Sequence, residues 1–272
     1  MSITALLYMK PRHWGLHAAR WLAGWWRMLH LGAVALVMAM SPSTYNRANR
    51  LATSRHIVAS TWQVLPWFTL LTALVSLVVI RIVLVTAQSY GLSRFALEMV
   101  VRVLVLELIP LSAALFAALR AGMAFDAAAM GLAMDLSSSG VPPALATEET
   151  LRRLRRDLVP QVFANAFAVL SLAMVSSVIV LVLAYLNVYG LSPWGIPDYT
   201  RTVGRVFDPV VTVGFVLKTV LFGLSVAVIP SAAMLELLRQ ARRHRTNVQP
   251  GALRLLFVLL LIEAGSLALK YI

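Results

Sequence analysis

FALEMVVRVLVLELIPLSAALFAALR, residues 95–120, is the stretch that decides the fold. It is long enough to cross a membrane, because about 20 helical residues cover the roughly 30 Å of hydrocarbon in a bilayer. It nevertheless contains Glu98, Arg102 and Glu107, together with Pro110. Ionisable groups at that depth are costly and usually face the interior of a helix bundle or a wet cavity. We therefore expect a buried central helix with the other spans packed around it.

The second half of this stretch carries two rows of small residues at four-residue spacing. Such rows let helix backbones approach closely inside lipid. They are Ala113, Ala117 and Ala121, and Ala114, Ala118 and Gly122. We take these six positions as candidates for packing between two copies of the chain.

The composition indicates an integral membrane protein and excludes an ordinary soluble domain. Of 272 residues, 60% are hydrophobic, and the mean hydropathy is +0.81. There is no cysteine, which excludes disulfides and thiolate metal sites, and the five histidines form no metal-binding motif. The formal net charge is +13, but the basic residues gather beside apolar runs. That distribution is typical of membrane topology rather than of nucleic-acid binding.

We predict an all-α integral membrane fold with an N-terminal interfacial helix and five spans. The spans are expected at residues 65–86, 95–120, 162–186, 210–235 and 253–269. Before them, Trp14, Trp21 and Trp25 share one helical face beside a basic flank, which indicates a helix lying in the membrane interface. The alternative is a span over residues 21–40 that contains Arg27 and His30.

Two domains follow from this assignment. Residues 1–56 hold the interfacial helix and a basic connector, and residues 57–272 hold the five spans. The longer domain includes a cytoplasmic coupling loop at 121–160 and a periplasmic loop at 187–209. The Lys and Arg count gives sixteen residues to one side and four to the other, which places the N-terminus in the cytoplasm and the C-terminus outside.

Two charged residues in different spans are our candidates for a buried ion pair. Glu107 lies in the second span and Lys218 in the fourth, and we expect them to contact each other across the two helices. Arg81 and Arg102 are further candidates for a substrate cavity, although Glu98 and Arg102 also form a four-residue pair on one helix. The alternative is that each of these side chains snorkels to the membrane surface.

The chain shows no means of hydrolysing ATP and no catalytic motif. GFVLKT, residues 214–219, ends like a P-loop but lacks the glycine before the lysine. EETLRRLRRDL, residues 148–158, is predicted to be a short amphipathic helix, with Pro160 starting the next element. Its charged residues are candidates for docking an ATPase: Glu148, Glu149, Arg152, Arg155 and Arg156. A solvated face, or arginines on anionic headgroups, is the alternative.

Five short motifs resemble one family, the MlaE-like permeases of ABC systems that work with MCE proteins on phospholipids. The resemblance covers roughly residues 60–235. The motifs are ELIP (107–110), RAG (120–122), LRRDLVP (154–160), FDPV (207–210) and KTVLFG (218–223). Departures occur at Leu106 and Ile109, where the family has Arg and Gly, and at Ala128, where it has an acid.

The resemblance implies a homodimeric permease in a bacterial inner membrane with phospholipid as substrate. It also implies two cytoplasmic ATPase subunits, which bind the ATP so that this chain needs no cofactor, and a periplasmic MCE-domain partner. Glu107 and Lys218 match family positions that carry an acid and a lysine. A self-contained membrane enzyme acting on lipid and a non-transporting assembly factor remain as alternative functions.

Overall fold

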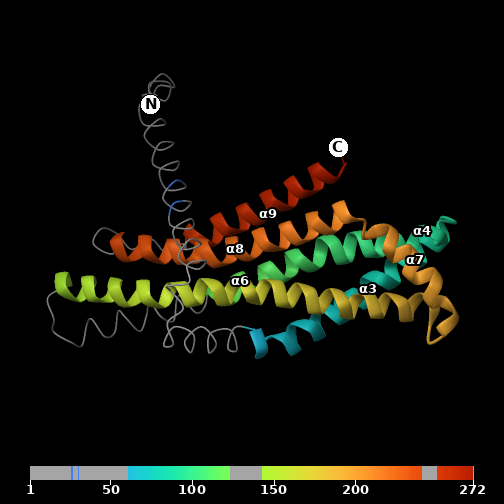
Figure 1. Ribbon diagram of the computed structural model, residues 1–272, viewed down its shortest axis with the longest axis horizontal. Helices are drawn as coiled ribbons and strands as arrows, with labels where there is room; N and C mark the ends of the chain where they lie inside the picture. The colour runs from blue at the N-terminus through green and yellow to red at the C-terminus, as the bar shows by residue number, and fades with distance from the viewer. Residues whose placement is uncertain (1–25, 27–29, 31–60, 123–142, 241–249, 272) are drawn as a thin grey trace, which may run out of the picture.

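The computed structural model describes residues 61–122, 143–240 and 250–271, together with Trp26 and His30. Every regular element in these ranges is a helix, which confirms the predicted all-helical class (Figure 1). The predicted interfacial helix, the alternative span over residues 21–40 and the basic connector lie outside the described ranges, apart from those two residues.

Five helices in the described ranges are long and apolar enough to cross a membrane, as predicted. They occupy Leu65–Ser89, Phe95–Gly122, Phe163–Tyr189, Pro209–Pro230 and Ala252–Lys270. The helices that contain the first and the last three of these spans are α3 (Leu65–Ser89), α6 (Pro143–Tyr189), α8 (Pro209–Gln240) and α9 (Pro250–Tyr271).

The second span is the central helix, and it is not uniform. It begins as α4 (Ser93–Val100), widens into the π-helix η4 (Val101–Leu108) and continues as α-helix over residues 109–122. Its buried residues pack against α3 and α6 on one side and against α8 and α9 on another. The expectation of a buried central helix is therefore correct.

Glycines end α3 and α6, the two helices that run toward the end of the bundle where α4 begins. We call this the α4–α7 end, after α4 and the helix α7 (Ile196–Val206) that lies there. Gly91 and Gly190 have φ of 70° and 65°, a left-handed backbone conformation that glycine adopts without a steric penalty. After α3, the amide of Leu92 donates to the carbonyl of Ala87 at 2.7 Å, closing a glycine-type helix end. The chain can therefore reverse within a few residues and enter α4.

The predicted loop at 187–209 contains a helix that sequence inspection missed. After the short 3₁₀-helix η5 (Pro193–Gly195), α7 spans Ile196–Val206. Its start has Pro197 and Asp198, and its last turn has Arg205, an arrangement that suits the helix dipole. Val206 is buried against the central helix, so α7 covers the α4–α7 end of the bundle.

The amphipathic segment at 148–158 is helical, but it is not the separate short helix that we predicted. It is the first part of α6, a helix of 47 residues that continues through Pro160. A proline removes one backbone hydrogen bond and bends a helix, but strongly helical flanking sequence can continue past it. α8 likewise continues through Pro230. The helical part of the predicted coupling loop therefore begins at Pro143, and residues 123–142 lie outside the described ranges.

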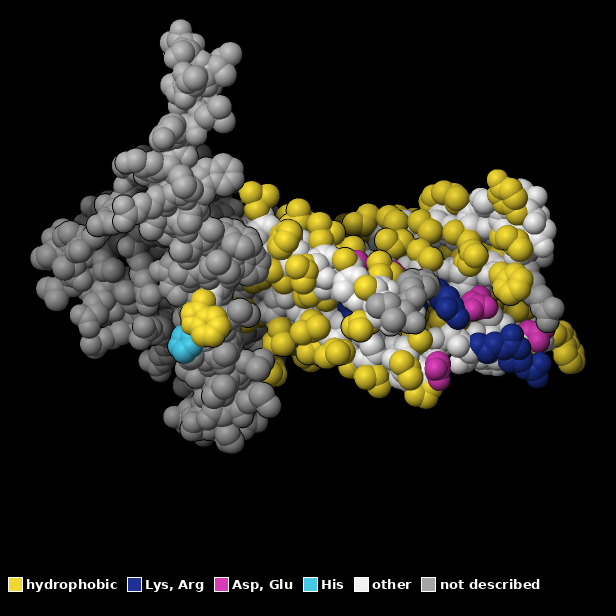
Figure 2. Space-filling view, turned by 90° about the horizontal axis from the view of Figure 1, so that it is seen from above, with side chains coloured by type: hydrophobic (Ala, Val, Ile, Leu, Met, Phe, Trp, Pro, Cys, Tyr) yellow, Lys and Arg dark blue, Asp and Glu magenta, His cyan; other side chains and the backbone are white. Residues whose placement is uncertain are grey.

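The surface of the bundle suits a bilayer. Figure 2 shows hydrophobic side chains over its middle, with Lys, Arg, Asp and Glu gathered toward the α4–α7 end. On α3, the exposed residues include Leu71, Leu74, Val78 and Ile82. Such a broad apolar face is expected where a helix contacts lipid or another transmembrane helix.

Candidate functional site: a charge cluster inside the bundle

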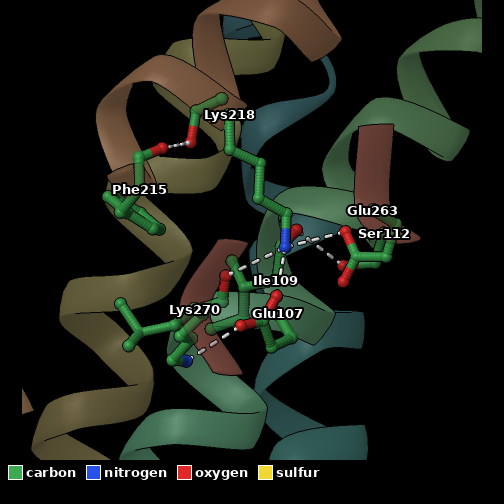
Figure 3. Close-up of polar contacts among 9 residues, drawn as sticks. Glu107, Ile109, Ser112, Phe215, Lys218, Glu263 and Lys270 are labelled. Atoms are coloured by element: carbon green, nitrogen blue, oxygen red, sulfur yellow. Dashed lines mark hydrogen bonds and ion pairs between the residues drawn. The ribbon is translucent and has the colours of Figure 1, made fainter. Parts of the chain in front are cut away.

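Four charged side chains from three helices meet within the membrane-spanning part of the bundle (Figure 3). Glu107 comes from η4, Lys218 from α8, and Glu263 and Lys270 from α9. We call these four residues the charge cluster. Lys218 Nζ contacts Glu107 Oε2 and lies 2.7 Å from Glu263 Oε2, while Lys270 Nζ lies 3.0 Å from Glu107 Oε1. Two acids and two bases alternate, so their formal charges cancel.

Lys218 is the most deeply buried member of the cluster, with 3% of its side chain exposed. Besides the two carboxylates, its Nζ lies 3.4 Å from the carbonyl oxygen of Leu106 and 5.8 Å from the centre of the Phe222 ring. An ammonium group has three donors, and three oxygens surround this one. The environment compensates for the loss of water that makes an isolated buried charge costly.

The backbone around Glu107 is arranged so that a carbonyl can face Lys218. In an α-helix the carbonyl of Leu106 would accept a hydrogen bond from the amide of residue 110, but Pro110 has no N–H. The preceding turns are π-helical, and the amide of Ile109 donates to Leu104, five residues back. Short π-helical segments are frequent at functional sites. Here the wide turn and the proline together leave an acceptor for the lysine ammonium.

α8 holds Lys218 in place through close packing against α6. One turn beyond Lys218, a Cβ added at Gly223 would lie 3.1 Å from the carbonyl oxygen of Ala166 on α6. That is tighter than nearly all Cβ contacts, so the glycine allows the two backbones to approach closely. Thr219, next to Lys218, donates to the carbonyl of Phe215 at 2.7 Å and is thereby satisfied within its own helix.

Of the four predicted cavity residues, the structure brings two together. Glu107 and Lys218 are in contact, as the pairing hypothesis expects. Arg102 instead pairs with Glu98 at 2.8 Å on the surface of the central helix, with 43% of its side chain exposed. Arg81 is exposed on α3 and forms no ion pair within the described part of the chain. Neither arginine belongs to the charge cluster.

The contribution of α9 was not predicted from the sequence, because neither Glu263 in the fifth span nor Lys270 at its end was among the candidate residues. The available signal was their spacing: seven residues apart, the two side chains lie on one face of a helix. That spacing alone does not say which helix the face meets.

Within the protomer the small-residue rows pack against neighbouring helices, and their assignment to dimer packing stays a prediction. Four of the six are buried inside the protomer: Ala113, Ala114, Ala117 and Ala121. Ala114 and Ala117 pack with α6, α8 and α9, while Ala113 packs with α3 and α6. Ala118 and Gly122 are half-buried. The reason is geometric, because a central helix is surrounded by its own neighbours and its small residues face them.

The predicted coupling residues Glu148, Glu149, Arg152, Arg155 and Arg156 all lie on the first part of α6. Their role stays a prediction. Among the residues that the structure describes, there is no group of three or more His, Asp or Glu side chains that could hold a metal ion.

Comparison with known proteins gives one result at the level of families. The sequence profile of the family described as Permease MlaE matches residues 53–267, which is 215 of the 272 residues. The matched range contains Glu107, Lys218 and Glu263 and ends just before Lys270. No curated protein and no solved structure matches the chain.

Proposed function

Because the chain belongs to the MlaE permease family, we propose that it is the permease subunit of an ABC transporter that moves phospholipid or a similar hydrophobic molecule. The transfer would run between a bacterial inner membrane and a periplasmic MCE-domain partner. A separate cytoplasmic ATPase would bind and hydrolyse the ATP, and two copies of the chain would form a homodimer.

The charge cluster is the observation that supports lipid transport most directly. A span that served only as an anchor would have no use for four ionisable groups, because each is costly inside a bilayer. Glu107, Glu263 and Lys270 keep 15%, 13% and 16% of their side chains exposed, so the cluster is not sealed. A polar cluster within an apolar bundle suits a molecule with a charged headgroup and hydrocarbon tails.

α6 is a suitable element for coupling ATP hydrolysis to the membrane domain. It is one continuous helix from Pro143 to Tyr189, and it packs against both α3 and α8. Under the proposed topology, its first part lies in the cytoplasm, where the five charged coupling residues would contact the ATPase. A push on that end would reach the bundle directly, because no loop interrupts the helix.

The proposed function is tested by co-expressing the chain with the candidate ATPase and reconstituting the purified complex into liposomes. We expect the ATPase to co-purify in a fixed ratio and lipid transfer to require ATP. Replacing Arg152, Arg155 and Arg156 together with alanine should reduce co-purification or uncouple ATP hydrolysis from transfer. The matched control is Thr219→Val, which lies on α8 outside the proposed coupling region.

Two outcomes would count against this function. If no nucleotide-binding subunit co-purified and the chain alone converted lipid chemically, the alternative of a membrane enzyme would be favoured. If neither an ATPase nor lipid transfer nor lipid conversion were found, the chain would be better described as an assembly factor.

A further inference from the structure

The charge cluster consists of two acid–base pairs that bind each other crosswise. Glu107 and Lys218, the core pair, belong to the packed interior of the bundle, and Glu263 and Lys270, the α9 pair, belong to the last helix. The acid of α9 binds the base of the core at 2.7 Å, and the base of α9 binds the acid of the core at 3.0 Å. Each pair is formally neutral by itself.

We propose that the core pair is a binding site for the headgroup of a zwitterionic phospholipid with a primary ammonium, and that the α9 pair occupies this site when no lipid is bound. This inference rests on the proposed function. A phosphate accepts hydrogen bonds from an ammonium as a carboxylate does, so it can replace Glu263 at Lys218. A primary ammonium offers the same donors as a lysine, so it can replace Lys270 at Glu107.

The packing of α9 allows this exchange. The apolar residues that α9 buries, Leu255 and Leu259, are both in its first half. From residue 260 to residue 270 none of its residues is buried, although Glu263 and Lys270 reach the core pair. Figure 1 shows α9 diverging from α8 toward its C-terminal end. The second half of α9 contributes only the half-buried Ile262 to the apolar core, so it can move away while exposing little apolar surface.

Charge balance selects the class of headgroup. When the α9 pair leaves, Lys218 loses an anion and Glu107 loses a cation, so a ligand must supply both. An anionic headgroup without an ammonium would replace Glu263 but not Lys270. Glu107 would then keep Lys218 as its one cation in the cluster, and Lys218 would also bind the headgroup phosphate. A quaternary ammonium has no N–H to donate to Glu107. The site therefore favours ethanolamine-type headgroups over glycerol-type and choline-type headgroups.

The experiment compares lipids retained by the full chain, in complex with its partners, in nanodiscs made from equal parts of phosphatidylethanolamine, phosphatidylcholine and phosphatidylglycerol. Retained lipid is identified by native mass spectrometry after mild detergent extraction. The test variant, Glu263→Gln with Lys270→Gln, removes the competing charges and leaves the core pair intact. The control is Leu260→Gln, which adds an amide at a neighbouring exposed position of α9.

We expect the double variant to retain about tenfold more phosphatidylethanolamine than the wild type. This factor applies if the α9 pair occupies the site about nine-tenths of the time in the wild type, because only the remaining fraction is then open to lipid. Phosphatidylglycerol and phosphatidylcholine should change little, and the control should match the wild type. Glu263→Asp keeps the charge but shortens the side chain, so it should give a smaller rise in the same direction.

Equal changes for all three lipids, or none, in a complex that still transfers lipid would overturn this inference and leave the proposed function standing. If neither the double variant nor Glu263→Asp folded, the inference would also be overturned, because the α9 pair would then be purely structural. If the wild-type complex neither retained nor transferred any lipid, the proposed function itself would fail.

Discussion

Replacing Lys218 with methionine tests the energetics of the charge cluster. Methionine keeps most of the length and apolar volume of the lysine but removes the charge and the three donors. The substitution deprives Glu263 of the ammonium at 2.7 Å, whereas Glu107 retains Lys270 at 3.0 Å. One buried carboxylate, rather than two, loses its cation in the cluster.

Removing one partner of a buried ion pair costs about 3–5 kcal/mol, largely because the remaining charge stays buried. With one carboxylate stranded, we place Lys218→Met within this range and not at twice it. Adding Glu263→Gln should recover a substantial part of the loss, because the double variant again contains equal numbers of acids and bases. The coupling between the two substitutions should therefore be large for a contacting pair, about 1–3 kcal/mol.

The assay is equilibrium unfolding in mixed micelles, with the free energy of unfolding determined for both single variants and for the double variant. Thr219→Val is the matched control, because Thr219 is equally buried and adjacent but bonds only within its own helix. It should cost no more than about 1.5 kcal/mol. A Lys218→Met protein as stable as this control would refute the account of a buried ion cluster, as would additive effects of the two substitutions.

A variant that combines Glu107→Lys with Lys218→Glu should not transfer lipid, because each new side chain would face a like charge from α9. Exchanging acid and base at all four positions of the charge cluster should give more lipid transfer than this double variant. Gly223→Val should cost about 1–3 kcal/mol through its clash with the Ala166 carbonyl, whereas Gly214→Val, where no atom lies within 4 Å of an added Cβ, should cost clearly less in the same unfolding assay. Burial raises the pKa of Tyr199 to about 12, so its contribution to stability should be complete below pH of about 10, the ordinary tyrosine value, and be lost as the pH rises toward the raised pKa. The ionisation of Tyr199 is measured as the difference in absorbance titration between the wild type and Tyr199→Phe. A phenol in this difference that ionised near pH 10 would show that burial has no effect.

Much of the fold could be predicted from the sequence because hydrocarbon thickness sets the length of each span. The five predicted spans match the described helices to within a few residues at most ends, and Glu107 and Lys218 were paired because an unpaired charge is costly there. The ends of elements were less predictable where proline was involved. The sequence predicts a new element at Pro160, but α6 continues through this residue, because a helix can accommodate a proline by bending.

The rest of the site depends on information that no single span contains. The π-helical turns over Val101–Leu108 change which residues of the central helix face α8, and nothing in the sequence of these residues predicts them. Lys270 reaches Glu107 on the central helix, and which side chains of a span meet a given neighbour depends on the tilt and rotation set by packing against that neighbour. The small-residue rows showed that close packing occurs but not with which partner.

The proposed lipid transport and the proposed headgroup selectivity both depend on Lys218 lying between two carboxylates inside the bundle. An experimental structure of the chain in a lipid nanodisc, at a resolution that shows side chains, tests this claim most directly. We expect Lys218 Nζ within about 4 Å of carboxylate oxygens from both Glu107 and Glu263, the usual limit for an ion pair. Lys218 extended toward the headgroup region, with Glu107 and Glu263 facing separate surfaces, would contradict it.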